Sequence, residues 1–331
     1  MTAFRIGKWI LPLVFMTVLT GNAWAAQKVL IIPAISEEVL KQHELAKRCL
    51  NGIRESIAQS DAVSELLYVP LYGAPEADKV AMGKETAEKV KLIKPNVIIL
   101  IGDDAVKYIG LSINDIPMVF SYVYADPESL GLPKPNITGV LARPFTEDTL
   151  ALAHQLTGVK TVAAIGRNSD AMADVEKRLT TMADDLEKTT GVRFKKMFLC
   201  DTFEEWQTRV GDNTAESLFL TDTSNIKQNG KEMTREDLTR WTVDHSKVPV
   251  FAATDADTEA GAVFAIVIDE RLWGMQSGAM ALKILKGTPI TEISPQFMEK
   301  GALVININTV IKYELDVPYE ILSVAREVYE N

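Results

Sequence analysis

One pattern of apolar and polar residues occurs twice along the chain, and it constrains the fold more than any other feature. In the first half, the apolar run 97–101 ends in small and acidic residues, and a helical interval separates it from a second run opened by Pro117. In the second half, the run 217–220 and the later run after Pro249 repeat this order. Continuous apolar runs separated by helices are typical of buried parallel strands. The repeat therefore predicts an α/β fold of two Rossmann-like lobes with parallel sheets, hinged around a ligand cleft at the carboxyl ends of the strands.

The first 26 residues are typical of a secretory signal peptide. Arg5 and Lys8 provide the positive start, residues 9–20 form a short apolar core, and Ala23-Trp24-Ala25 matches the small-x-small cleavage pattern. The apolar core is shorter than the roughly 20 residues that a membrane span needs. No cysteine follows the cleavage site, so we expect a periplasmic product without a lipid anchor.

Length and charge restrict the organisation and the partners of the exported chain. The roughly 300 residues that remain after cleavage exceed a single core and indicate two domains. We expect residues 27–135 plus about 268–300 in the first lobe, and about 136–267 plus 301–331 in the second. The formal net charge of −10 disfavours nucleic acid and anionic lipid as partners. We expect a monomer.

Periodicity and capping residues place the individual elements. Strands are predicted at 28–32, 66–69, 97–101, 118–121, 161–165, 193–199, 217–220, 262–268 and 303–306. Helices are predicted at 37–58, 77–93, 145–156, 171–189, 234–245, 272–285, 309–315 and 319–328. The Pro- and Gly-rich stretch 126–139 is the expected crossing between the lobes.

Signals for catalysis or metal binding are weak. His43, His154 and His245 all lie in predicted helices without a second ligand or a paired nucleophile, which favours ordinary surface or core histidines. No nucleophile elbow, zinc motif, P-loop or dinucleotide fingerprint is present. We therefore expect no catalytic residue, no metal and no cofactor. A bond between Cys49 and Cys200 would join the two lobes, and two separate buried thiols are the preferred interpretation.

The candidate ligand-binding residues are polar side chains at or just after the ends of predicted strands. They are Ser36, Asp103, Asp104, Ser121, Tyr122, Arg167, Asn168, Asp222, Thr223 and Asp255. The aspartates favour a cationic or zwitterionic ligand, although aspartate is also common as a helix cap. Arg167 could bind a ligand carboxylate with two hydrogen bonds, and Tyr122 could stack on a planar ligand. We expect the ligand to be held from both lobes at once.

Several short segments, taken in their order and spacing, resemble the ABC-transporter substrate-binding proteins of the tryptophan-binding-like family. The segments that carry this resemblance are 94–98, 116–120, 126–127, 136–140, 248–251, 261–262, 274, 279–281, 284–287, 304–306 and 317–318. The resemblance covers most of the chain after the signal peptide. It implies the type I periplasmic binding protein fold, a small-molecule ligand and delivery of that ligand to the membrane permease of an ABC transporter.

The chain departs from the family pattern at three places that line the expected cleft. One additional residue separates Phe120 from Asp126-Pro127, the loop 33–36 lacks the usual polar pattern, and Gly102-Asp103-Asp104 replaces a small or hydroxyl-bearing turn. The identity of the ligand therefore does not carry over. An amino acid or a related amine-bearing compound is the leading class. The alternatives are a ligand-sensing module for a membrane receptor and, on the same scaffold, a periplasmic hydrolase or racemase.

Overall fold

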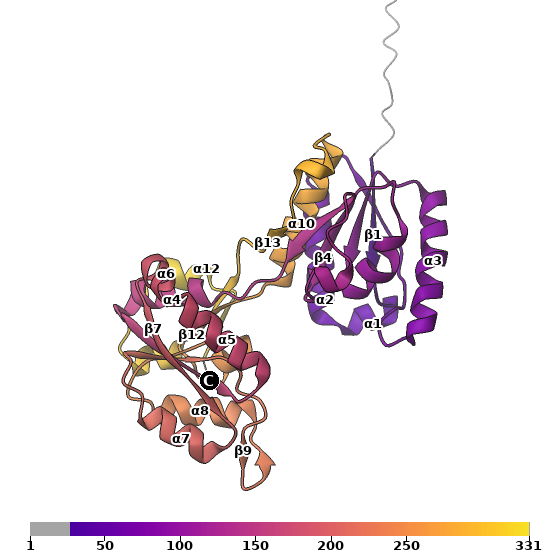
Figure 1. The fold of residues 1–331 in the computed structure, drawn as a ribbon. Helices are drawn as coiled ribbons and strands as arrows, with labels where there is room; N and C mark the ends of the chain where they lie inside the picture. Colours follow the sequence, from indigo (N-terminus) through magenta and orange to yellow (C-terminus); the bar gives the residue numbers. More distant parts are fainter. Residues whose placement is uncertain (1–26, 331) are drawn as a thin grey trace, which may run out of the picture.

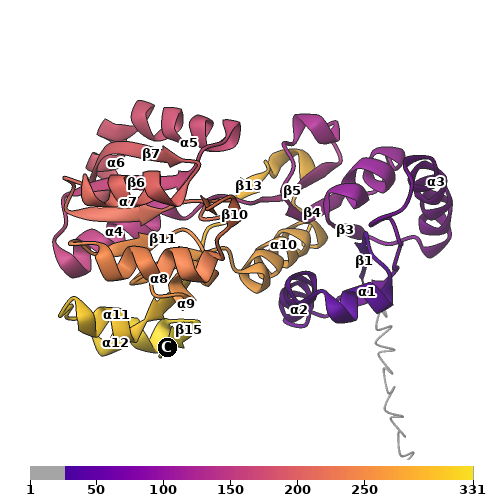
Figure 2. The same cartoon turned by 90° about the horizontal axis from the view of Figure 1, so that it is seen from below.

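The computed structural model describes residues 27–330 as two α/β lobes joined by three chain segments (Figures 1 and 2). The chain crosses between the lobes after residue 141, after residue 267 and after residue 297. Each of these residues ends a strand of one lobe, and the element that follows belongs to the other lobe. The predicted two-lobe fold with parallel sheets is confirmed. The expected signal peptide lies outside the described residues.

The first lobe is built on a sheet of six strands whose neighbours are all parallel. In spatial order the strands are β13 (Gln296–Phe297), β5 (Ile137–Leu141), β4 (Met118–Val123), β3 (Val97–Ile101), β1 (Lys28–Pro33) and β2 (Val63–Leu66). The helical segments are α1 (Glu37–Gln42), α2 (Glu44–Ile57), α3 (Glu76–Ile93), α10 (Glu270–Leu285), the π-helix η1 (Ala105–Ile109) and the short turns η2 (Gly110–Ser112), η3 (Glu128–Leu130) and η4 (Ile290–Glu292).

Successive residues of the central strands face two different cores, as the period of two in a β-strand requires. In β1, Leu30 and Ile32 pack with α3 and η1, whereas Val29 and Ile31 pack with α2 and α10. All four side chains are fully buried. The continuous apolar runs in the sequence therefore reflect strands that are covered on both faces.

Helix α10 lies against α2 although more than 200 residues separate them in the sequence (Figure 1). Their backbones approach through glycines: a Cβ atom at Gly274 would lie 2.0 Å from the Cys49 carbonyl oxygen, and one at Gly52 would lie 1.9 Å from that of Arg271. No larger side chain fits at such positions. This contact makes a late segment of the chain part of the first lobe.

The second lobe contains two sheets. The strands β11 (Val250–Ala252), β8 (Ser217–Leu220), β6 (Thr161–Arg167) and β7 (Arg193–Cys200) are parallel in this spatial order, and β12 (Phe264–Val267), β14 (Ala302–Asn306) and β15 (Glu327–Tyr329) form the other sheet. The helices are α4 (Thr146–Thr157), α5 (Asp170–Thr181), α6 (Ala183–Thr190), α7 (Phe203–Gly211), α8 (Arg235–His245), α9 (Asp255–Glu259), α11 (Ile307–Lys312) and α12 (Tyr319–Val324). A small hairpin of β9 (Lys227–Gln228) and β10 (Lys231–Glu232) extends from this lobe.

The structure differs from the expected elements in several places, and the helix expected over 171–189 is divided at Met182. The helix expected over 37–58 is divided at His43, and the second strand begins at Val63 rather than at residue 66. The helix expected over 319–328 ends at Val324, because residues 327–329 pair with the open edge of β14 as β15. In addition, β5 pairs with β4, so residues 137–141 lie in the sheet of the first lobe. We therefore propose that the first crossing lies at 142–145 rather than at 135.

Candidate functional site

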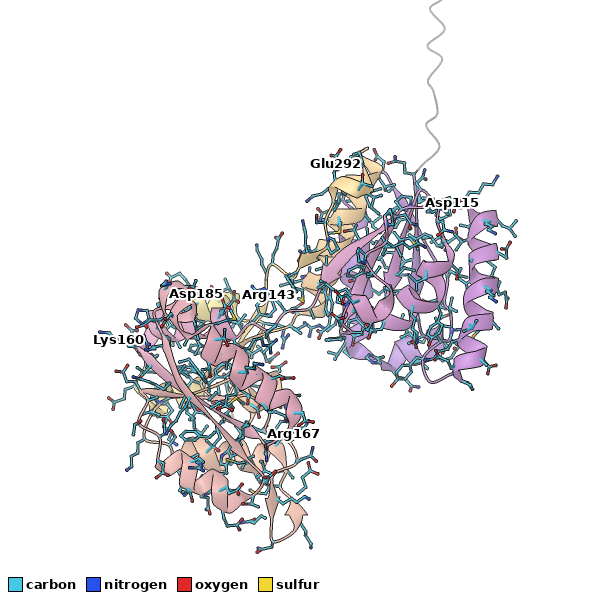
Figure 3. The ribbon with its side chains drawn as sticks, in the orientation of Figure 1. Asp115, Arg143, Lys160, Arg167, Asp185 and Glu292 are labelled. Carbon is cyan, nitrogen blue, oxygen red and sulfur yellow. The ribbon has the colours of Figure 1, made fainter. Side chains whose placement is uncertain are left out.

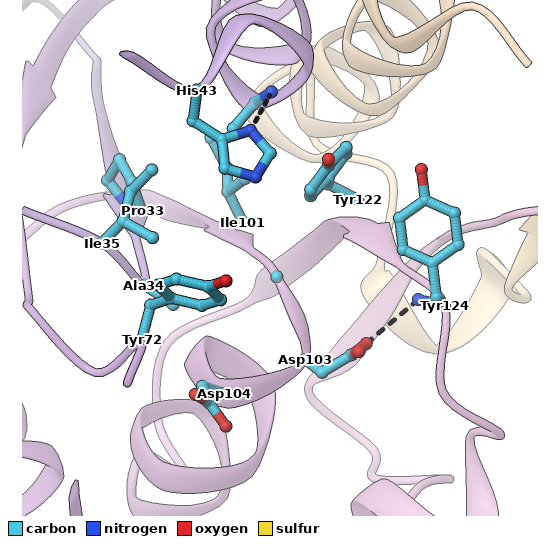
Figure 4. A pocket seen from close by; sticks show the side chains of 12 residues that line it. Pro33, Ala34, Ile35, His43, Tyr72, Ile101, Asp103, Asp104, Tyr122 and Tyr124 are labelled. Carbon is cyan, nitrogen blue, oxygen red and sulfur yellow. Dashed lines mark hydrogen bonds between the residues drawn. The ribbon is translucent and has the colours of Figure 1, made fainter. Parts of the chain in front are cut away.

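A pocket of about 250 Å³ lies at the carboxyl ends of β1, β3 and β4 in the first lobe (Figure 4). Apolar residues at the end of β1 and in α2 and β3 form part of its lining. The side chains with polar or aromatic groups that line it are His43, Tyr72, Asp103, Asp104, Tyr122 and Tyr124. Three of these, Asp103, Asp104 and Tyr122, are among the residues predicted from the sequence, and they come from different loops that the sheet brings together.

A β-bulge places Tyr122 in this pocket. Phe120 pairs with Gly139 and Val123 with Leu141, so Ser121 and Tyr122 of β4 together oppose a single residue of β5. The backbone of Tyr122 adopts the left-handed conformation, with a φ of 58°. Bulges of this kind redirect side chains and often lie next to binding sites. The bulge accommodates one additional residue of β4 between Phe120 and Val123.

Tyr122 and Tyr124 belong to an aromatic cluster with Trp273 of α10. The centroids of the Tyr122 and Tyr124 rings lie 5.3 Å apart with nearly perpendicular planes, and both rings are within 5.7 Å of Trp273. Such edge-to-face contacts hold aromatic rings in fixed orientations. Burial raises the pKa of both tyrosines, with further contributions from Glu270 at Tyr122 and from Tyr122 and Glu270 at Tyr124, so their hydroxyl groups stay protonated at neutral pH.

The two predicted aspartates of the pocket have different partners. One carboxylate oxygen of Asp103 accepts hydrogen bonds from the backbone N–H groups of Tyr124 and Ala125, at 3.0 and 3.2 Å (Figure 4). Asp103 thereby fixes the loop that carries Tyr124. Asp104 forms an ion pair with Lys79 of α3 at 2.8 Å, and this hydrogen bond raises the pKa of Lys79. Of these two aspartates, Asp104 has a cationic partner and Asp103 has none among the described residues.

His43 contributes a hydrogen-bond donor that the sequence did not predict. It lies between α1 and α2, where its Nδ1 accepts a hydrogen bond from the Ala46 backbone N–H at 3.4 Å. An accepting Nδ1 requires the neutral ring with its proton on Nε2, and Figure 4 shows this nitrogen pointing into the pocket. The sequence suggested an ordinary histidine because nothing in the local pattern indicates a break between the two helices.

Two other predicted residues of the first lobe have structural partners beside the pocket. Ser36 caps α1 by accepting a hydrogen bond from the Val39 N–H, and it does not line the pocket. Ser121 is fully buried, accepts a hydrogen bond from Ser277 at 2.9 Å and contacts the Cys49 sulfur. Its side chain belongs to the interface of β4 with α2 and α10, because the bulge exposes Tyr122 instead. Neither residue enters the site that we propose.

In the second lobe, Arg167 and Asp222 form an ion pair at the ends of β6 and β8. The Arg167 Nε lies 2.7 Å from one carboxylate oxygen of Asp222, and the other carboxylate oxygen accepts two hydrogen bonds from Ser224. Burial favours the neutral acid, but the Ser224 hydrogen bonds and the Arg167 charge outweigh it and lower the pKa of Asp222. Asn168 donates a hydrogen bond to Asp201. In the view of Figure 3, Arg167 lies on the side of this lobe nearer the first lobe, and Lys160 lies on the far side.

The remaining two candidates lie deeper in the second lobe. The Thr223 hydroxyl is buried and donates a hydrogen bond to Asp257 at 2.7 Å. Asp255 accepts a hydrogen bond from Tyr329 and is paired with Arg326, beside the second crossing. None of the second-lobe candidates lines the pocket of the first lobe. That the ligand is held from both lobes at once therefore stays a prediction, and it requires the lobes to approach each other.

Within residues 27–330, no group of three or more His, Cys, Asp or Glu side chains is arranged to hold a metal ion. In the same part of the chain, no helix combines the length and apolar character needed to cross a membrane. Cys49 and Cys200 are buried, separate thiols, and burial raises the pKa of each to about 12. Their positions agree with the preferred interpretation from the sequence.

Comparison with known proteins identifies relatives of the whole chain. The family model for ABC transporter substrate binding protein matches residues 39–329. The ligand-free, open structure of CD0873, a substrate binding protein with adhesive properties from Clostridium difficile, has a TM-score of 0.64 and 16% identity, covering 92% of this chain and 100% of that one. No curated protein matches the sequence.

Two further solved structures are similar to this chain. A XylFII–LytSN complex has a TM-score of 0.52 and 15% identity, covering 82% of this chain and 95% of that one. An ABC domain in complex with L-Trp from Streptococcus pneumonia has a TM-score of 0.48 and 18% identity, covering 92% of this chain and 100% of that one. At these identities, the similarity concerns the fold alone.

Proposed function

Because this chain belongs to the family of ABC transporter substrate-binding proteins, we propose that it is an exported, periplasmic member that binds a small amine-bearing solute and delivers it to the permease of an ABC importer. Members of this class bind and present a ligand and do not transform it. We propose the same for this chain, which would act as a monomer without a cofactor.

The observation that carries this proposal is the aromatic pocket at the strand ends of the first lobe. It is concave, largely apolar and supplied with a few polar groups, which is the usual composition of a small-molecule site. The Asp103 carboxylate and the Nε2–H group of His43 give it one acceptor and one donor for an oriented ligand. Its volume of about 250 Å³ suits a solute of the size of an amino acid or amine.

Closure of the second lobe would complete the site. The pocket in the described state is lined by the first lobe alone, and the Arg167–Asp222 pair lies at the corresponding strand ends of the other lobe. Hinge motion around connecting segments is a common mechanism of closure around ligands. We propose that Arg167, Asn168 and Asp222 reach the ligand only in the closed form.

Thermal shift followed by calorimetric titration tests the proposal. A ligand that binds only the folded protein at 100 times its dissociation constant should stabilise it by about 2.7 kcal/mol. Tyr124→Ala should weaken binding while the Tm of the free protein stays within a few degrees. Binding should also reduce the radius of gyration measured by small-angle X-ray scattering. A broad library of amines and amino acids without any stabilising compound would contradict the proposed function.

A further inference from the structure

The charges around the pocket are unusual for a protein that would bind amino acids. Two carboxylates, from Asp103 and Asp104, belong to the lining, and the lining contains neither lysine nor arginine. The Asp104 charge is balanced by Lys79 at 2.8 Å, whereas the partners of Asp103 are backbone N–H groups. The pocket therefore has one uncompensated negative charge and no positive side chain to receive a ligand carboxylate.

The groups next to the pocket do not reverse this balance. Glu270, at the start of α10, is only 6% exposed and acts electrostatically on both Tyr122 and Tyr124. Two cations act on it: Arg48, whose guanidinium lies 2.7 Å from Asp269 and 4.0 Å from Glu270, and Arg326, which lies 3.6 Å from Asp269 and is paired with Asp255. These two arginines face three carboxylates, so they leave no excess of positive charge beside the aromatic side of the pocket.

The turn that precedes η1 is occupied by acidic side chains. Asp103 and Asp104 follow β3 and Gly102 and directly precede η1. A ligand carboxylate placed at this turn would lie close to the carboxylates of Asp103 and Asp104. Repulsion between like charges at close range is unfavourable. This turn therefore selects against an anionic group on the ligand.

The second lobe offers an arginine that is already paired. Arg167 lies 2.7 Å from Asp222, and Asp222 is held by two hydrogen bonds from Ser224. A ligand carboxylate that approached this guanidinium would lie beside the fixed Asp222 carboxylate, which already balances its charge. Closure of the lobes would therefore bring a neutral ion pair to the ligand and no free positive charge.

The aromatic walls suit a cation. Figure 4 shows Tyr72 on one side of the pocket and Tyr124 on the other, with Asp103 between them. Tyr72 is 68% exposed and Tyr124 is 53% exposed, so both rings have free surface for a ligand in the described state. The faces of aromatic rings attract ammonium groups, and a nearby carboxylate adds to this attraction.

From this arrangement we propose that the ligand is a cationic organic amine without a carboxylate, such as an arylalkylamine, and that the site discriminates against the corresponding amino acids. The ammonium group binds Asp103 between the tyrosine rings, and in a ligand such as tyramine the Nε2–H group of His43 donates to the oxygen at the other end. This inference rests on the proposed function and narrows its class of solute.

Matched pairs of compounds that differ only in a carboxylate provide the test. Calorimetric titration of the full mature chain should give a dissociation constant for tyramine at least tenfold lower than for tyrosine, and the same order for tryptamine and tryptophan. Equal affinities, or tighter binding of the amino acids, would overturn the inference and leave the proposed function intact. If neither compound of either pair binds, the inference is wrong for these amines, and the broader library of amines and amino acids decides the proposed function.

Two sets of variants connect the preference to the residues. Asp103→Asn keeps an acceptor for the Tyr124 N–H and removes the charge, so tyramine binding should weaken roughly ten- to a hundredfold while the preference over tyrosine largely disappears. Tyr72→Leu should bind tyramine more weakly, because it removes one of the two aromatic rings. Asp115→Asn, an exposed carboxylate at the opposite end of the sheet (Figure 3), should change neither affinity. An unchanged preference in Asp103→Asn would contradict the role of this carboxylate.

Discussion

At the scale of single residues, the sequence predicted part of the candidate site. Asp103, Asp104 and Tyr122 were predicted because each follows a strand, and parallel strands place their carboxyl ends at one edge of the sheet. Tyr72 lies in a loop whose path depends on tertiary packing, so no local pattern could have indicated it. The hydrogen-bond partners of the predicted residues could not be predicted either, because Asp103 accepts a hydrogen bond from the backbone N–H of Tyr124, 21 residues later.

The Arg167–Asp222 pair leads to a prediction about pH. The pKa of Asp222 is lower in the folded protein than in the unfolded chain, so its contribution to stability is present above the ordinary aspartate pKa of about 3.9 and is lost as the pH falls through the lower folded value. Asp222→Asn should lower the free energy of unfolding by about 1 kcal/mol at pH 7, and by progressively less as the pH falls below the ordinary aspartate value.

Urea unfolding of both proteins between pH 2.5 and pH 7 measures this difference. Ser224→Ala is the matched control, because it removes the hydroxyl donor to the carboxylate and retains both the backbone N–H donor and Arg167. It should reproduce part of the same pH dependence. A difference that stays constant, or grows, towards low pH would show that the charge of Asp222 is not responsible.

At the scale of elements, periodicity predicted the buried strands well and the edges of the sheets poorly. The central strands have continuous apolar runs because both of their faces are covered, and the sequence shows this directly. Strand β15 has three residues and forms only because β14 offers an open edge. Its sequence follows a helical spacing, so tertiary pairing overrides the local preference there.

The contact between α2 and α10 supports a prediction about stability. Gly274→Ala would place a methyl group 2.0 Å from the Cys49 carbonyl oxygen, so the two helices must separate. We expect the free energy of unfolding to fall by about 1–3 kcal/mol, the usual cost of overpacking a core. Gly211→Ala in α7 is the control, because nothing lies within 4 Å of its added Cβ. That variant should be unchanged or slightly more stable, and an equal loss in both would contradict this account.

At the scale of the whole molecule, the crossings between the lobes are held by arginines. Arg143 lies in the first crossing. Its Nε–H group donates a hydrogen bond to the Met298 carbonyl oxygen at 2.8 Å and thereby joins the first crossing to the third. At the second crossing, Arg326 contacts Asp269 at 3.6 Å and is also paired with Asp255. The repeat in the sequence predicted two lobes, but it contained no information about these contacts, which connect residues far apart in the chain.

Export of the chain is a prediction for the mature protein. Protein recovered from the periplasm should begin at Ala26 or Gln27, because the small-x-small pattern ends at Ala25. Its intact mass should match the unmodified chain, since no cysteine is available at that position for a lipid. A mass that retains the apolar core 9–20 would contradict export by cleavage.

The glycine contact between α2 and α10 also determines when the first lobe can fold. One of its two cores includes Trp273, Met280 and Ala281, so this core stays open until the chain has been synthesised past residue 285. A ribosome that has completed β5 has produced most of this sheet but not the helix that covers one face of it. The first lobe is therefore the first to begin, and it cannot be completed until most of the second lobe has been synthesised, although the second lobe itself still awaits β14 and β15.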